Sequence, residues 1–163
     1  MPEHTLFVDL DGVLADFDRG VQALFSGKLP SELFAPVMWQ RLATTPSFYE
    51  HLGWMPDGHE LWDFAKPFSP IILTGLPLGN WAEPQKRAWC SRELGTDVEV
   101  LTCLSREKHK HAVAKIRPHT IPVLVDDRIK LKDAWVAAGG IFIHHRRSVE
   151  SIESLRALGF VNT

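Results

Sequence analysis

The sequence predicts an α/β fold built on a parallel sheet, with a small helical cap inserted after the first strand. Short apolar runs typical of buried strands alternate along the chain with amphipathic helical segments, and this alternation is typical of parallel sheets with right-handed crossovers. Three of the runs, 5–9, 70–74 and 121–125, end in or run into polar residues. Because ligands of such sheets bind at the carboxyl ends of the strands, we expect a functional site there.

The first strand, expected over 5–9, runs into the sequence DLDGV, in which Asp9 and Asp11 are followed at once by Gly12. Side chains two apart in a strand share a face, and two carboxylates so placed repel unless a cation or a proton lies between them. Gly12 permits a tight turn whose backbone N–H groups can converge on an anion. The motif therefore indicates a metal-assisted phosphate site, although on its own it more often marks a strand that ends in a polar turn.

The later strands and helices are expected to complete the sheet and its two covering layers. A glycine, Gly75, directly follows the second strand, and the fourth strand ends in Asp126 and Asp127. The expected order is strand 70–74, helix 81–94, strand 98–101, a short helix beginning in the basic segment SREKHKHAVAK, strand 121–125, helix 131–138, strand 141–143 and helix 148–158.

The segment 14–57 interrupts this alternation and contains too many aromatic residues for a loose loop. A helix is expected directly after Gly12, and a second over 31–42 with Ser31 as its N-cap. A further helix over 58–65 leads into the second strand. The sequence thus predicts a core domain formed by 1–13 and 58–163, and a helical cap formed by 14–57.

Composition narrows the class of protein. The chain has 163 residues, 45% of them hydrophobic and 23% charged, which is sufficient for one folded domain with a small insert. The net charge of −2 provides no general attraction to nucleic acid. Cys90 and Cys103 lack CxxC spacing, so we expect reduced thiols. Without an apolar run long enough to span a membrane, and without a secretory leader pattern, a cytoplasmic protein is expected.

Four motifs occur in the order DLDGV, LTG, Lys108 and VDD, and together they resemble the haloacid dehalogenase-like phosphohydrolase superfamily. The resemblance covers nearly the whole chain. It implies a Rossmann-like three-layer sandwich whose five-stranded parallel sheet has the order 3-2-1-4-5, with a small helical cap after the first strand. Within the superfamily, DLDGVLADF, SREK and VLVDDR look most like the 5'(3')-deoxyribonucleotidase group.

The resemblance implies separate catalytic roles for the two neighbouring carboxylates. Asp9 would be the nucleophile that forms an aspartyl-phosphate, and Asp11 would protonate the leaving alcohol and then activate water. Mg²⁺ would be held by Asp9, the backbone carbonyl of Asp11 and Asp126, since it prefers hard oxygen ligands. Asp127 would orient Lys108 or a metal-bound water.

The phosphate and the rest of the substrate would be held by residues from later motifs. Thr74 and the Gly75 N–H would bind phosphate oxygens, and Lys108 would supply a compensating cation, with Lys110 the alternative by position. Arg106 matches a basic position that reaches the substrate in the nucleotidase group.

Phe17 matches the nucleotidase position that packs against the base, where stacking is worth about 1–3 kcal/mol. The other cap aromatics are expected to be buried more often than to contact substrate; they are Phe34, Trp39, Phe48, Tyr49 and Trp54. One departure matters: after Thr74 the sequence GLPLG lacks the serine and nearby lysine of the nucleotidases. Nucleotide specificity is therefore left open by the sequence.

The predicted function is that of a Mg²⁺-dependent phosphomonoesterase acting on a small-molecule phosphate monoester, with a nucleoside monophosphate favoured. The alternatives are a sugar-phosphate or other small-metabolite phosphatase, a 3'-phosphatase on nucleic-acid ends, and a catalytically silent phosphate-binding regulatory domain. The histidine pairs His109/His111 and His144/His145 offer a weaker alternative, a transition-metal site. We expect a monomer or a homodimer.

Overall fold

A computed structural model describes residues 3–162 and contains one parallel sheet. Its strands are β1 (His4–Val8), β2 (Ile71–Gly75), β3 (Val100–Cys103), β4 (Ile121–Asp126) and β5 (Ile141–His144). They lie in the order β3-β2-β1-β4-β5, and each neighbouring pair is parallel. The predicted sheet and its 3-2-1-4-5 order are confirmed. The first strand is central, which explains why it is apolar on both faces.

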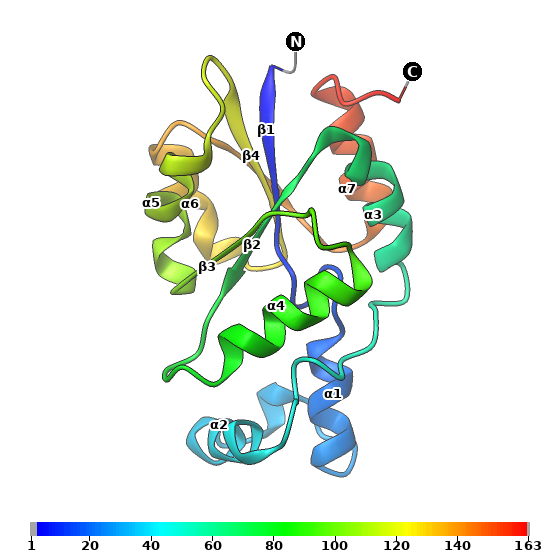
Figure 1. Cartoon of the computed structure of the whole chain (residues 1–163), viewed down its shortest axis with the longest axis vertical. Helices are drawn as coiled ribbons and strands as arrows, with labels where there is room; N and C mark the ends of the chain where they lie inside the picture. Colours follow the sequence, from blue (N-terminus) through cyan, green and yellow to red (C-terminus); the bar gives the residue numbers. More distant parts are fainter. Residues whose placement is uncertain (1–2, 163) are drawn as a thin grey trace.

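Helices cover both faces of the sheet, and alternate residues of β1 point to opposite layers. Leu6 and Val8 belong to the larger buried cluster, to which helices α3 (Gly58–Ala65), α4 (Ala82–Glu93) and α7 (Ser148–Ala157) contribute. Phe7 belongs to the smaller cluster, on the side of α5 (Lys108–His111) and α6 (Lys132–Ala137). Figure 1 shows α5 and α6 together on one side of the sheet, and α3 and α7 on the other.

The segment 14–57, which the sequence predicts to be a cap and which is called the cap here, contains α1 (Phe17–Leu24), a short 3-10 turn at Pro30–Glu32 and α2 (Ala35–Thr44). In Figure 1, α1 and α2 lie at the end of the molecule toward which the strands run, opposite the two chain termini. The carboxyl ends of the strands therefore face the cap. None of the helices among residues 3–162 combines the length and apolarity needed to cross a bilayer.

Three elements begin two or more residues after the start that the sequence predicts. The first cap helix begins at Phe17 because the Asp16 side chain accepts a hydrogen bond from the Arg19 N–H and caps it. The second begins at Ala35, where Pro36 occupies the first turn and needs no hydrogen-bond acceptor for its nitrogen. The third strand begins at Val100, two residues later than expected, with Val100 paired to Ile72.

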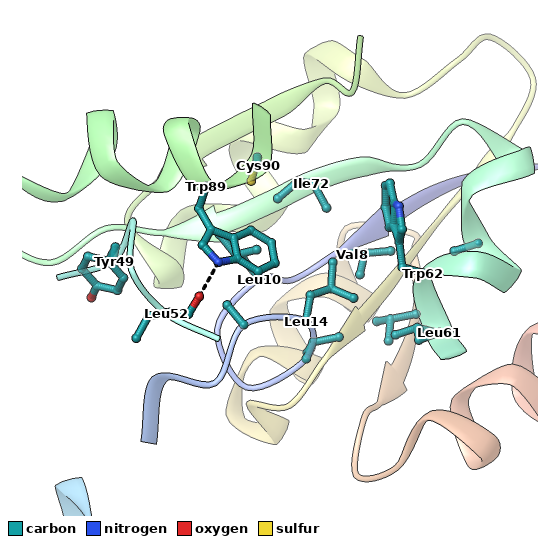
Figure 2. Close-up of a cluster of buried hydrophobic side chains, with 14 of the residues drawn as sticks. Val8, Leu10, Leu14, Tyr49, Leu52, Leu61, Trp62, Ile72, Trp89 and Cys90 are labelled. Carbon is teal, nitrogen blue, oxygen red and sulfur yellow. Dashed lines mark hydrogen bonds between the residues drawn. The ribbon is translucent and has the colours of Figure 1, made fainter. Parts of the chain in front are cut away.

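The return segment of the cap, residues 45–57, leads from α2 back to α3 and is hydrogen-bonded to α4. Trp89 of α4 is 1% exposed, and its indole Nε1 donates to the Leu52 carbonyl at 2.8 Å, as Figure 2 shows. Gln85 of the same helix accepts a hydrogen bond from the Tyr49 N–H at 2.8 Å. Since a buried indole N–H requires a partner, Trp89 both fills the core and fixes the return segment against the sheet.

Candidate active site

The two aspartates of DLDGV lie at the carboxyl end of the central strand. The Asp9 N–H donates to the Val125 carbonyl at 2.9 Å, which continues the β1–β4 ladder and turns the buried Asp9 side chain toward β4. Gly12 has a φ of 80°, and a Cβ atom there would lie 2.2 Å from Asp127 Oδ2. The glycine is therefore required both by the turn and by the close approach of the Asp127 carboxylate.

Lys108 lies between two of the carboxylates. Its Nζ donates to Asp9 Oδ1 at 2.9 Å and to Asp126 Oδ2 at 2.7 Å, and the side chain is 3% exposed. Burial alone would lower the pKa of Lys108, but the two carboxylates raise it above its ordinary value. Lys110 is exposed. Of the two lysines proposed from the sequence, Lys108 is thus the one that reaches the aspartates.

Asp9, Asp126 and Asp127 form an acidic cluster whose ligand atoms all lie within 4.8 Å of one another. Burial and the neighbouring Asp9 charge raise the pKa of Asp126 to about 6 and that of Asp127 to about 8. The raised pKa values indicate that Lys108 alone does not offset the negative charge of the three carboxylates. Closely spaced carboxylate oxygens are the ligands that suit Mg²⁺. The residues present therefore fit the ion that the resemblance implies.

The histidine pairs do not join a metal cluster in the part of the chain that the structure describes. His145 is buried, and its Nδ1 lies 2.7 Å from Ser151 Oγ. His144 Nε2 lies 3.2 Å from the Asp127 carbonyl oxygen. The structure thus gives no support to the alternative of a histidine-based metal site.

Lys86 is the site residue that the sequence reasoning missed. This α4 side chain is buried, and its Nζ donates to Asp11 Oδ2 at 2.6 Å, Thr74 Oγ1 at 3.1 Å and the Gly75 carbonyl at 2.5 Å. The signal was present in the sequence as a lysine within an otherwise apolar helical stripe, since the buried residues of α4 are Ala82, Lys86, Trp89 and Cys90.

The neighbouring carboxylates Asp9 and Asp11 have different electrostatic surroundings. Burial alone would raise the pKa of Asp9, but the charge and hydrogen bond of Lys108 hold it below its usual range. Burial raises the pKa of Asp11 above its usual range, although Lys86 opposes that rise. Such divergent environments are typical of carboxylate pairs that divide catalytic tasks.

The end of β2 supplies the second wall of the site. Thr74 is fully buried. A Cβ atom on Gly75 would lie 1.9 Å from Ser105 Oγ, so the loop after β3 packs directly on this glycine. Ser105 thus adjoins Gly75, and Lys86 adjoins Thr74.

A cavity of about 660 Å³ opens above these residues and is lined by Asp9, Asp11, Lys86 and Lys108. A second cavity of about 910 Å³ adjoins it, and Trp39 lines both. The second cavity has apolar walls from α2 and from the loop after β2, while Arg106, Arg128 and Lys130 line its other side. Arg106 therefore lines the adjoining cavity and not the one that contains the aspartates.

Phe17 is the first residue of α1 and lines the catalytic cavity. Its ring stacks on Tyr49 and Trp39 with centroid separations of 6.0 and 5.9 Å. Among the other cap aromatics, Phe48 and Tyr49 are buried as expected, whereas Phe34 is 72% exposed. Tyr49 is buried yet also lines the cavity, so burial and substrate contact are not exclusive here.

Solved structures with the same fold include two hydrolases. A hydrolase from Streptococcus pneumoniae TIGR4 superposes with a TM-score of 0.58 at 15% identity, over 96% of this chain and 100% of its own. A structure described as a haloacid dehalogenase-like hydrolase from Burkholderia xenovorans LB400 gives 0.57 at 14% identity, over 99% and 100%. No family model and no curated protein matches the chain in sequence. The chain thus shares its fold with both of these structures.

Proposed function

We propose that the protein is a Mg²⁺-dependent phosphomonoesterase that works through an aspartyl-phosphate on Asp9. The observation that carries the proposal is the arrangement at the floor of the cavity, where buried Asp9 is held by Lys108 beside Asp11 and Asp126. An anionic nucleophile next to a fixed cation, with a second carboxylate two residues away, meets the requirements of in-line phosphoryl transfer.

In the proposed reaction, an Asp9 carboxylate oxygen attacks phosphorus, and the bond from phosphorus to the ester oxygen breaks. Asp11 gives a proton to the departing oxygen, then accepts one from the water that attacks the aspartyl-phosphate and releases phosphate. Lys108 offsets the negative charge shared by Asp9 and the phosphoryl group. Mg²⁺, held by Asp9, Asp126 and the Asp11 backbone carbonyl, would supply further positive charge at the phosphate oxygens.

The favoured substrate is a nucleoside monophosphate. The adjoining cavity of about 910 Å³ offers room for a leaving group much larger than a small sugar. Trp39 and Trp81 contribute flat apolar surface to its walls, and Arg106 contributes positive charge. Phe17 lines the catalytic cavity together with Asp9 and Asp11 and stacks on Trp39, which lines both cavities, so its ring would contact the nucleoside.

A phosphate-release screen tests the proposal. Nucleoside 5'- and 3'-monophosphates are compared with sugar phosphates, each with Mg²⁺ and with EDTA. We expect Mg²⁺-dependent release that is fastest with nucleotides. Faster hydrolysis of sugar phosphates would support the small-metabolite alternative, and the absence of release from every ester would support the silent regulatory domain. Intact Asp9 and Asp11 argue against that last outcome, since a phosphate-binding domain needs no acid.

A further inference from the structure

We propose that Lys86 is a positioning residue that holds the Asp11 carboxylate through Oδ2 in the orientation from which Asp11 exchanges its proton. This inference rests on the proposed function, in which Asp11 is the acid and then the base. It adds to that function a residue from outside the four motifs.

The hydrogen bonds of Lys86 exclude a direct role in binding phosphate. An ammonium group has three N–H donors. Those of Lys86 point to Asp11 Oδ2, Thr74 Oγ1 and the Gly75 carbonyl. With every donor engaged by the protein, Lys86 acts on the substrate only through the groups that it orients.

The other oxygen of Asp11, Oδ1, is shielded from solvent and has no hydrogen-bond partner among the described residues. The hydrogen bond from Lys86 to Oδ2 is therefore the contact that fixes the orientation of this carboxylate. Asp11 lines the catalytic cavity, and its side chain is 22% exposed, so the carboxylate that Lys86 orients can be reached by a substrate.

The cap covers Lys86 and links it to the substrate-binding side of the molecule. The Tyr49 ring lies over Nζ at 4.5 Å from its centroid, and Tyr49 itself stacks on Phe17. Figure 2 shows Tyr49 and Leu52 of the return segment beside Trp89 of α4, the helix that carries Lys86. Because this packing excludes water from the ammonium group, the bond from Lys86 to Asp11 is strengthened by a low local dielectric.

Proton transfer can then be followed through one carboxyl group. In the first step the proton on Asp11 passes to the ester oxygen as its bond to phosphorus breaks. In the second step the Asp11 carboxylate takes a proton from water as the water oxygen bonds to phosphorus and the bond to Asp9 breaks. Lys86 keeps its three protons throughout and maintains the orientation of the carboxylate.

The test measures whether the loss of activity in Lys86→Met depends on the leaving group of the ester. p-Nitrophenolate departs readily without a proton, whereas the alkoxide of glycerol 2-phosphate requires one. General acid catalysis contributes about 10²–10⁴-fold, so we expect kcat/KM for glycerol 2-phosphate to fall about 10²-fold further than kcat/KM for p-nitrophenyl phosphate. The ratio kcat/KM is compared because it reports the first step, in which Asp11 is the acid, whereas the second step is the same for both esters. Little change in the inhibition constant of inorganic phosphate is expected, since the three N–H donors of Lys86 are engaged by the protein. Equal losses of kcat/KM with both esters, or weaker inhibition by phosphate, would overturn the inference.

A double-mutant cycle provides the second readout. In an Asp11→Asn background, Lys86→Met should cause little further loss of activity toward glycerol 2-phosphate, because the carboxylate that Lys86 orients has already been removed. A full additional loss would argue that Lys86 acts independently of Asp11. Arg87→Met, at the next position of α4, is the matched control and should retain activity toward both esters.

A second variant and the activity of the wild type separate a failure of this inference from a failure of the proposed function. If Lys86→Met does not fold, as judged by circular dichroism, Lys86→Gln carries the same comparison, because its amide retains N–H donors. It should show a smaller loss with the same bias toward glycerol 2-phosphate. A wild-type protein that releases phosphate from neither ester and from no nucleoside monophosphate contradicts the proposed function, whereas an active wild type with unbiased variants contradicts only the role of Lys86.

Discussion

Replacing Lys108 with methionine removes the cation shared by two buried carboxylates, Asp9 and Asp126. The lysine lies 2.9 and 2.7 Å from their oxygens, and all three side chains are almost fully buried. Removing one partner of a buried ion pair costs about 3–5 kcal/mol, because the remaining charge is left uncompensated. For a chain of 163 residues, where 1 kcal/mol shifts Tm by roughly 2–4 °C, this corresponds to a fall of about 6–20 °C.

The measurement is thermal unfolding by circular dichroism in EDTA, with phosphate release measured in parallel. Lys110→Met is the matched control, since this exposed lysine lies only two positions away. Adding Asp126→Asn to Lys108→Met should restore part of the lost stability, because it removes one of the uncompensated charges. A Tm for Lys108→Met within about 2 °C of wild type, or an equal fall for Lys110→Met, would refute the reasoning.

Three other predictions concern substrate preference, pH and thiol reactivity. Phe17→Ala should raise KM for nucleotides by about 5- to 150-fold, the equivalent of one stacking contact, and leave p-nitrophenyl phosphate nearly unaffected; an unchanged preference between these substrates would exclude stacking on Phe17. Burial lowers the pKa of His145, so the unfolded chain binds the proton more readily, and stability should be complete above about pH 6.5 and decline below it. His145→Gln should flatten that decline in urea titrations, and parallel pH profiles would contradict this assignment. Burial raises the pKa of the Cys90 thiol to about 12 and also raises that of Cys103, so both should resist Ellman's reagent until the protein is unfolded; rapid labelling of the native protein would contradict their burial.

Local pattern was sufficient to predict the sheet and the position of its site. The alternation of apolar strands and amphipathic helices predicts parallel pairing, and the polar residues after β1, β2 and β4 mark the strand ends at which the cavity opens. Lys108 was predicted because it belongs to an ordered set of motifs. The division into core and cap domains, and a cytoplasmic location, stay predictions.

Local pattern marks Lys86 only as a lysine within the apolar stripe of α4, and its role depends on how α4 docks against β1 and β2. A lysine in a helix is ordinarily solvated. Only the packed structure shows that the side chain points inward to Asp11 and Thr74. The start of α1 was missed for a similar reason, since a helical repeat alone does not reveal that Asp16 turns back to cap the Arg19 N–H.

Trapping the covalent intermediate tests the central claim most directly. The protein is mixed with Mg²⁺ and p-nitrophenyl phosphate, quenched in acid within one turnover, and its intact mass and peptides are measured. We predict the added mass of one phosphoryl group on the peptide that contains Asp9, its loss on treatment with hydroxylamine, and its absence from Asp9→Asn. Phosphate release by Asp9→Asn at the wild-type rate, with no phosphorylated peptide in either protein, would contradict the account.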